Sequence, residues 1–401
     1  MKFEANRRAM LEAARSVAKI APNLSSKNNL KKILLECNDD TGEVHMAATN
    51  HDVSVQHKII ASVEESGSLL IQPDLLVGIM SKLEGEHVKI STQPDKPRVL
   101  IITGGRCTFR INNYSPEGYP KPTMPFPEES VIMTGICSLV KKTTIAISKD
   151  ETKLALQCVQ IRIKNNAVHA AACDTTSLML VKDSATNTDE CEFLLPGRSL
   201  QVLASICADS DVFEVGDIGH AVVFVRGDMT FTIRKWITGS FIDVATVVKD
   251  ITPLYAAVVD VGEMKEALNL ISITALAGSG RKPVNLVLSD GEIIMRCKND
   301  HSEGKSCAPA SVSKKTPDEG FLYDVFALIK LFQVVSGRVK LEIDDRGFMS
   351  VKTRNEAYFQ SSVRPQAENG EPAEETEKQK RAKGTNDVKV RNETTKAKEA
   401  A

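Results

Sequence analysis

The sequence has little of three features that would narrow its function at once: aromatic side chains, net charge and long apolar runs. Aromatic residues occupy only 5% of the 401 positions, which argues against stacking platforms for single-stranded nucleic acid. The 51 Lys and Arg residues balance 52 Asp and Glu residues, so a globally basic nucleic-acid binder is excluded, whereas a basic patch is not. No stretch approaches 18 consecutive apolar residues, so we expect no membrane-spanning helix and no membrane partner.

Signals for secretion and for disulfide bonding are also missing. No apolar run follows Met1–Asn6, so no secretory signal is expected. The nine cysteines are an odd number, form no C-x-x-C pair and mostly lie inside apolar runs. We therefore expect reduced core thiols and a cytoplasmic protein.

Catalytic and cofactor motifs are absent or weak. There is no G-x-x-x-x-G-K-[ST], and Gly278-Ser279-Gly280 lacks the rest of a dinucleotide fingerprint. His51 and His57 are six positions apart, a poor spacing for metal ligands. Cys173 has no histidine assigned to it, so a buried strand-end thiol is favoured over a nucleophile. The sequence thus predicts no catalytic residue, no metal and no cofactor, with an enzyme of unrecognised Cys or His chemistry as the alternative.

The segment 366–401 differs in composition from the rest of the chain. Its 36 residues contain eight acidic and eight basic side chains, and Val388 and Val390 are its only large apolar residues. Such a segment cannot bury enough surface to offset its chain entropy, so it is predicted to be a disordered charged tail. A nucleic-acid arm at Lys378–Lys383 is the alternative, and a solvated tail is the favoured interpretation.

The remaining chain repeats with a period of about 125 residues. Residues 69–91, 193–216 and 321–344 each combine an apolar strand, a turn, an amphipathic helix and a second strand. A second set keeps the same period, with a helix and then a strand hairpin in each repeat. Its helices are expected at Arg7–Ala21, Ile136–Ile147 and Val261–Ala275.

These repeats predict an α+β fold of three tandem domains, each with two helices packed on antiparallel sheets of about eight strands. The expected domains are residues 1–125, 126–250 and 251–365, followed by the tail at 366–401. Five prolines between Pro116 and Pro127 mark the first boundary, because proline does not suit a central strand.

Basic residues recur on the helices and loops of each repeat. On the first helix, Arg8, Arg15 and Lys19 lie on one polar stripe. The other candidates are Lys27, Lys31, Lys32, Lys141, Lys142, Lys149, Lys153, Arg198, Arg281 and Lys282. A solvated helix face is the ordinary interpretation, but the recurrence favours a phosphate-contacting surface, where each contact adds roughly −0.9 to the salt slope. No base-reading signature accompanies these residues, so such a surface would be blind to DNA sequence.

Six short stretches stand in a distinctive order along this body. They are Met1–Phe3, Ser25–Lys27, Ala48–Asp52, Ala146–Lys153, Lys235–Asp243 and Ser362–Arg364. Together they resemble the β subunit of bacterial DNA polymerase III, the sliding clamp, over about residues 1–364. The resemblance implies a non-catalytic DNA polymerase processivity factor, in which two three-domain protomers close head to tail into a ring around duplex DNA. The partners it implies are double-stranded DNA, a second copy of the chain as a homodimer, the replicative polymerase, the clamp loader and other proteins with a clamp-binding motif.

The resemblance also assigns roles to individual residues. Lys27 corresponds to a basic residue after the family's first helix, and Lys149 and Lys153 to a DNA-facing loop. The dimer interface would contain Phe109, Ile111, Ile273 and Leu276, although local core packing is an equal interpretation of these four. A pocket for partner peptides would be lined by Leu156, Cys173, Thr175, Leu178, Ile242, Thr246, Val247 and Ser361.

This pocket is where the sequence departs most from the family. The family usually has Thr-Asp-Gly-His-Arg-Leu where this chain has Cys173–Leu178, and Ile242 and Ser361 replace a proline and an apolar residue. The altered lip predicts a changed peptide specificity, as in a clamp that serves a mobile element or phage replisome. The alternative is a clamp-shaped accessory interaction protein that does not close on DNA.

Overall fold

The computed structural model describes residues 1–21, 29–93, 95–121, 129–184, 190–236, 241–249, 251–276 and 283–363. Three predicted phosphate-contacting residues, Lys27, Arg281 and Lys282, lie outside the described residues, as does the predicted tail at 366–401. The stretch Met1–Ser362 forms one unit. Within the described ranges, no helix has the length and apolar character needed to cross a membrane.

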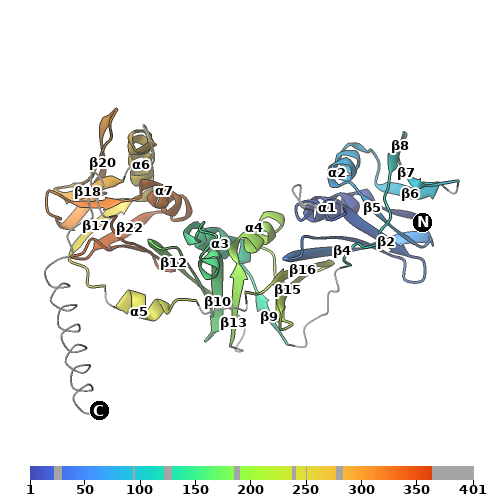
Figure 1. Ribbon diagram of the computed structural model, residues 1–401, viewed down its shortest axis with the longest axis horizontal. Coiled ribbons are helices and arrows are strands. Elements are labelled where there is room, and N and C mark those ends of the chain that lie inside the picture. Colours follow the sequence, from blue (N-terminus) through green and yellow to red (C-terminus); the bar gives the residue numbers. More distant parts are fainter. Residues whose placement is uncertain are drawn as a thin grey trace, which may run out of the picture. The chain divides into compact units, whose positions relative to one another are not determined.

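One order of elements occurs three times in these residues: a strand, a helix, four strands, a second helix and three strands (Figure 1). The first repeat consists of β1 (Lys2–Asn6), α1 (Arg7–Ala18), β2 (Ile33–Asn38), β3 (Glu43–Thr49), β4 (Val53–Glu65), β5 (Gly67–Ile71), α2 (Pro73–Lys82), β6 (His87–Gln93), β7 (Lys96–Gly104) and β8 (Cys107–Asn112).

The second and third repeats follow the same order. The second consists of β9 (Ser130–Met133), α3 (Ile136–Thr143), β10 (Cys158–Lys164), β11 (Ala167–Cys173), β12 (Ser177–Ser184), β13 (Cys191–Pro196), α4 (Gly197–Ile206), β14 (Phe213–Asp217), β15 (Ala221–Arg226) and β16 (Met229–Arg234). After the short helix α5 (Val244–Lys249), the third consists of β17 (Tyr255–Asp260), α6 (Val261–Leu276), β18 (Val284–Ser289), β19 (Glu292–Lys298), β20 (Glu303–Lys314), β21 (Phe321–Tyr323), α7 (Val325–Val334), β22 (Arg338–Ile343), β23 (Met349–Lys352) and β24 (Glu356–Gln360). The predicted α+β fold of tandem copies, with two helices packed on antiparallel sheets in each, is confirmed.

Local sequence explains where the helices begin and end. The side chain of Asn6 caps α1 by accepting hydrogen bonds from the backbone amides of Arg8 and Ala9. The helix expected at 136–147 is shorter than predicted, because α3 ends at Thr143 and a 3-10 turn follows at Thr144–Ala146. The run of β-branched residues at this point disfavours a further α-helical turn, and the Thr143 hydroxyl donates to the Leu139 carbonyl.

Strands of consecutive repeats pair directly, so the sheets continue from one repeat into the next. Antiparallel β4 and β16 place Val55 opposite Phe231, and antiparallel β12 and β24 place Leu178 opposite Phe359. The result is two sheets of 12 strands among the described residues. In the first sheet, β8 is an end strand that pairs with β7 alone.

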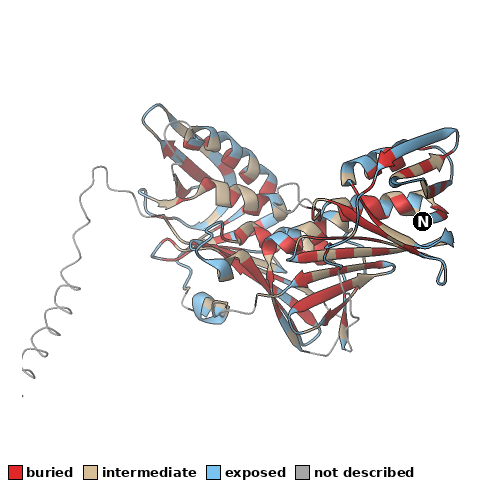
Figure 2. Ribbon diagram, turned by 45° about the vertical axis from the view of Figure 1, so that its right-hand side comes forward, coloured by how far each residue is buried: buried red, intermediate tan, exposed pale blue. Residues whose placement is uncertain are grey.

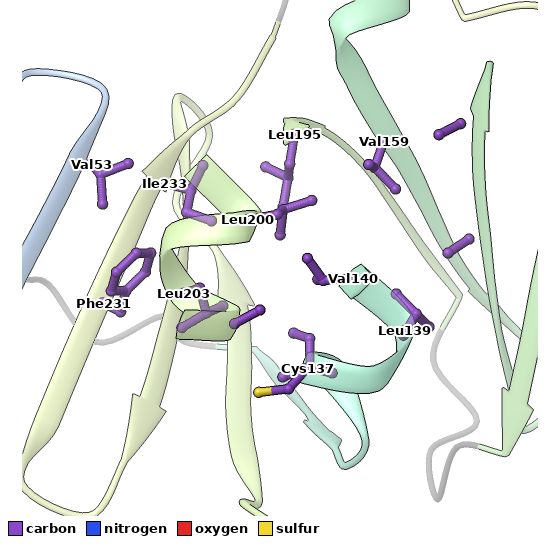
Figure 3. Packing of buried hydrophobic residues seen from close by; sticks show 14 of the residues in the cluster. Val53, Cys137, Leu139, Val140, Val159, Leu195, Leu200, Leu203, Phe231 and Ile233 are labelled. Carbon is purple, nitrogen blue, oxygen red and sulfur yellow. The ribbon is translucent and has the colours of Figure 1, made fainter. Parts of the chain in front are cut away.

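The helices α1–α4, α6 and α7 bury one face and leave the other exposed (Figure 2). In the second repeat, Val140 of α3 lies toward Leu200 and Leu203 of α4 (Figure 3). Phe231 and Ile233 of β16 lie beside α4 in the same core. Each fully buried aliphatic or aromatic side chain of this kind stabilises the fold by about 1.5–3 kcal/mol. Because the apolar face is used for packing, the polar face of each helix is available for other contacts.

Candidate nucleic-acid interface and partner pocket

The exposed face of α1 carries the cations that the sequence predicts there. Arg8, Arg15 and Lys19 are exposed and line a hollow of about 530 Å³ between α1, α2 and α4. The Lys19 ammonium donates a hydrogen bond to the backbone carbonyl of Ser205, in the last turn of α4. Two carboxylates, Glu12 and Asp74, also line this hollow, so three cations face two anions there and the cationic charge is partly balanced.

A second hollow, of about 700 Å³, lies between α3, α4 and α7 and is more strongly cationic. It brings together Lys141, Lys149 and Arg198, three exposed residues from separate elements that the sequence predicts to contact phosphate. Lys330 of α7 also lines it, and none of its lining residues in the described part of the chain is acidic. A surface with several cations and no carboxylate suits a polyanion, because each phosphate contact releases counterions.

Sequence reasoning missed the contribution of the third repeat to this hollow. Lys330 and Gln333 of α7 line it together with Gln201 of α4 and Ser148. A signal was present, since the apolar stripe of α7 leaves Lys330 and Gln333 three positions apart on the remaining face. The sequence does not show which neighbouring helices this face lies against, because that depends on the tertiary structure.

Lys142 is placed differently from its prediction. It does not line the hollow, and its Nζ atom lies 2.8 Å from Oε1 of Glu356 on β24. Burial by itself would raise the pKa of Glu356, but hydrogen bonds from Lys142 and Thr353 outweigh it and hold that pKa below its usual value. The structure therefore argues against Lys142 as a phosphate contact, because its ammonium already has a partly buried carboxylate partner.

Lys32 also differs from its prediction. The residue is buried, and its Nζ atom lies 4.4 Å from the centroid of the Tyr114 ring. Burial, and then the charge of Lys31, lower the pKa of Lys32. An ammonium held over a ring in this way is poorly placed to reach a phosphate. Lys31 is only partly exposed, whereas Lys153 forms an exposed ion pair with Asp150 at 4.0 Å and stays accessible.

Four of the predicted pocket residues meet in one apolar cluster that is separate from the main core. Cys173, Leu178 and Phe359 form its buried centre, and Leu156 and Ile242 pack against them. Strand register explains the centre, because Leu178 lies opposite both Cys173 and Phe359. Phe359, which the sequence analysis missed, also stacks on Phe348 with 6.2 Å between ring centroids.

The other four predicted pocket residues lie outside the apolar cluster. Thr175, Thr246 and Val247 are exposed, and the Thr246 hydroxyl donates to Oδ2 of Asp243 at 2.6 Å. Ser361 is partly exposed, and its backbone amide donates to the Thr176 carbonyl at 2.9 Å. The apolar floor of the predicted pocket is therefore assembled, and polar groups lie at several of the remaining positions.

The Cys173 thiol of this cluster is poorly suited to act as a nucleophile. Burial, and then the nearby Asp174 carboxylate, raise the pKa of Cys173 to about 11, so its thiol is protonated at neutral pH and is a poor nucleophile. Across the described ranges, no group of three or more His, Cys, Asp and Glu side chains could hold a metal ion.

The four predicted interface residues fall into two classes. Ile111 is buried in the core of its own repeat, as the local-packing interpretation expects. Ile273 and Leu276 are exposed on α6, and so is Leu270, which the sequence analysis missed. These three residues are spaced by three, so they form an apolar stripe on one side of the helix.

Phe109 differs from its counterparts in the other repeats. It is the third residue of β8, as Phe231 is of β16 and Tyr358 is of β24. Phe231 and Tyr358 are 0% and 2% exposed at the joins between repeats, whereas Phe109 is 37% exposed. An aromatic position that is buried at two joins is therefore open on β8, which among the described strands pairs with β7 alone.

Comparison with known proteins identifies a family for this fold. The family model described as the DNA polymerase III beta subunit, N-terminal domain, matches residues 1–125, and the model for the central domain matches residues 132–243. The beta sliding clamp of Staphylococcus aureus is 24% identical over 260 residues, which are 62% of this chain and 68% of that protein. The beta sliding clamp of Staphylococcus epidermidis is 25% identical over 204 residues, which are 48% of this chain and 54% of that protein.

Solved structures share the fold across most of the chain. The DNA polymerase sliding clamp from Bacillus subtilis superposes with a TM-score of 0.80 at 18% identity, covering 91% of this chain and 100% of that chain. A sliding clamp from Pseudomonas aeruginosa bound to griselimycin superposes with a TM-score of 0.79 at 17% identity over the same shares. Since the two matched family models together span more than half of the sequence, the chain belongs to the DNA polymerase III beta subunit family, the non-catalytic sliding clamps that act as processivity factors for DNA polymerase.

Proposed function

We propose that this chain pairs with a second copy to form a closed ring around double-stranded DNA, in the cytoplasm, and tethers the replicative polymerase to its template. A clamp loader would place the ring, and other proteins with a clamp-binding motif would dock on it. Each copy would contribute three domains, with boundaries near residues 125, 250 and 365. The observation that carries the proposal is the hollow lined by Lys141, Lys149 and Arg198, whose lining in the described part of the chain contains no acidic residue. Contacts to phosphate alone are equivalent along a duplex, which is what sliding requires.

The joins within the chain support a second copy. The last strand of the second repeat, β16, pairs with β4, and the last strand of the third, β24, pairs with β12. By the same rule, β8 should pair with β20, the strand of the third repeat that corresponds to β4 and β12. Within the described residues, β20 pairs with β19 alone along Glu303–Pro309, and β8 ends its sheet. A third join of this kind therefore needs a partner subunit, and two such joins close a ring.

The repeat also predicts the register of this join. A turn marks the same point before β4, β12 and β20, because side-chain oxygens of Asn50, Asp174 and Asn299 each accept hydrogen bonds from the backbone amides two and three residues later. Counted from this turn, Gly304 corresponds to Val55, which lies opposite Phe231. We therefore expect Phe109 to lie opposite Gly304 of the partner subunit.

The chemistry of the two surfaces agrees with this register. Gly304 lies beside α6, because a Cβ atom added to it would come within 2.6 Å of Oγ1 of Thr274. A Phe109 ring over this glycine would lie near the exposed apolar stripe of α6, made of Leu270, Ile273 and Leu276. The next residue along, Arg110, would then lie opposite Glu303 of the partner subunit, and opposite charges stabilise such cross-strand pairs.

Retention on circular DNA tests the ring. The purified chain is allowed to reassociate in the presence of a nicked circular plasmid, and the complex is compared with the same plasmid after linearisation. We expect a dimer in solution, retention on the circle and loss from the linear form, because a ring slides off a free end. A dimer that releases both forms equally, or a monomer, would overturn the proposal and favour a clamp-shaped accessory protein.

The peptide pocket is the part of this function that we expect to differ from other clamps. Its floor is apolar at Cys173, Leu178 and Phe359, but Ser361 stands where the family has an apolar residue. We expect weak binding of a consensus clamp-binding peptide and a gain of about 1 kcal/mol, roughly fivefold, in the Ser361→Leu variant. Isothermal titration checks this, and tight binding by the unmodified chain would contradict an altered specificity.

A further inference from the structure

A second groove lies next to the predicted peptide pocket and shares none of its eight residues. It has a volume of about 560 Å³ and runs along β10, β11, β12, β23 and β24 beside α5. The strand register sets Ala171, Leu180 and Ala357 side by side across three strands. Because alanines flank Leu180 on both sides, the sheet surface is hollowed there. Val244 and Val248 of α5 form the apolar wall of this trough.

Cations surround the trough. Among the described residues that line it, five are basic and only Glu356, which Lys142 already engages, is acidic; the basic residues are Arg162, Lys164, Lys182, Lys352 and Arg354. Three of them have carboxylate partners, namely Glu192, Glu190 and Glu342. Lys182 and Arg354 are exposed and form no ion pair within the part of the chain that the structure describes.

His169 adds a neutral aromatic surface between these groups. It lies opposite Lys182 on the neighbouring strand, and burial followed by the Lys182 charge lowers its pKa. At neutral pH the imidazole is therefore uncharged and extends the apolar part of the groove. The result is an apolar trough with two unengaged cations at one end.

The groove is also accessible from the side of α5. None of the residues in this six-residue helix is buried. Val244 and Val248 line the groove and also pack against the cluster around Leu178. Leu180 and Ala357 of the trough pack against the same cluster, so the groove and the predicted pocket adjoin over one apolar layer, although none of the eight predicted pocket residues lines the groove.

We propose that this groove binds an acidic peptide segment of a partner protein, with apolar side chains in the trough and carboxylates facing Lys182 and Arg354. Charge complementarity favours an acidic ligand, and the apolar floor gives it anchoring contacts. Nucleic acid fits less well, because a phosphate backbone gains nothing from Ala171, Leu180 and Ala357. The proposal is independent of the ring, since no groove residue lines the two cationic hollows.

Fluorescence anisotropy with a defined probe tests this site. The probe is a short labelled peptide that alternates leucine with glutamate, compared with the same peptide carrying lysine instead and with a labelled oligonucleotide. The full chain should bind the acidic peptide and neither comparison ligand. Failure to bind it, or equal binding of all three, would overturn the proposal.

Substitutions locate the binding. The Lys182→Glu, Arg354→Glu double variant should weaken the peptide at least tenfold, and Ala357→Leu, which fills the trough, should also weaken it. Lys96→Glu is the matched control, because Lys96 is likewise an exposed strand lysine but lies on β7. Retention on circular DNA should be unchanged in all three variants. Unaltered peptide binding in the double variant would contradict the assignment.

Photo-crosslinking separates this groove from its neighbour. A peptide with a photoreactive leucine should attach to β12, β24 or α5 near Leu180, Ala357 and Val248. Attachment confined to Cys173, Leu178 and Phe359 would mean that the peptide uses the predicted pocket instead, and the proposal would fail.

Discussion

Lys142 of α3 and Glu356 of β24 form an ion pair across the join between the second and third repeats, with 2.8 Å between Nζ and Oε1. Its neighbour Lys141 lines the cationic hollow and lies 3.8 Å from Asp209 in an exposed pair. Two consecutive lysines therefore have different roles, one in the fold and one at the surface that we assign to DNA.

Replacing these lysines one at a time should separate the two roles. Lys142→Ala leaves Glu356 partly buried without its partner, so we expect a loss of about 1–2 kcal/mol in the free energy of unfolding at pH 7, measured with urea. Lys141→Ala is the control and should leave stability unchanged, because exposed pairs contribute little. The opposite ranking would contradict the assignment.

The same ion pair should depend on pH in a defined direction. The pKa of Glu356 is lowered in the folded chain, so its stabilising effect is present above its usual value of 4.5 and is lost as the pH falls through the lowered value. The stability difference between wild type and Lys142→Ala should therefore shrink on acidification below about pH 4. A constant difference down to pH 3 would argue that the carboxylate is not involved.

DNA affinity should respond to salt through individual cations of the second hollow. Each of Lys149→Ala and Arg198→Ala should make the plot of log affinity against log salt less steep by roughly 0.9. The change should be the same for any duplex sequence, since these residues are assigned to phosphates. Titration of labelled duplexes at several salt concentrations measures it. A sequence-dependent effect would point to base contacts instead.

The strand register predicts a charge swap at the dimer interface. Arg110→Glu should weaken the dimer by placing two carboxylates opposite each other, and so should Glu303→Arg through two cations. The double variant should recover the dimer, as measured by sedimentation equilibrium. Phe109→Ala, which removes an aromatic anchor, should weaken it by about 2 kcal/mol, roughly 30-fold. If the double variant stays monomeric, the register is different.

His57 should make the fold less stable in mild acid, at pH values above those at which the carboxylates become protonated. It is 7% exposed, opposite Met229 at the join of β4 and β16. Burial, and then the charge of Arg226, lower the pKa of His57 to about 4 from 6.5. Between these values the unfolded chain binds a proton that the folded chain does not, so stability falls as the pH falls from 6.5 to 4.

Substitution isolates the contribution of this histidine. The corresponding residue of the second repeat is Val181, so His57→Val should fit the site. We expect the variant to lose less stability than wild type between pH 7 and pH 5, measured from thermal unfolding midpoints. Parallel pH profiles for the two proteins would show that His57 is not the responsible group.

Residue patterns were enough to predict the repeated architecture and the orientation of its helices. The period of apolar residues is a local property, so α1 could be assigned a buried face and a cationic face before its neighbours were known. The exact end of α3 could not be predicted from the sequence, because the Thr143 side-chain contact and the following 3-10 turn compete with helix propensity within a single turn.

Burial and partners, in contrast, depend on segments far apart along the chain. Lys32 and Lys142 look like Lys149 and Arg198 in the sequence, but Tyr114 and Glu356 engage the first two and leave the others exposed. The same holds for Phe109, which is exposed because β8 ends its sheet within the described residues and has a neighbouring strand on one side only. Local composition specified which elements form, and only the packing of distant strands and helices decided which charges face a ligand, because solvation and ion pairing are set by what lies nearby in space.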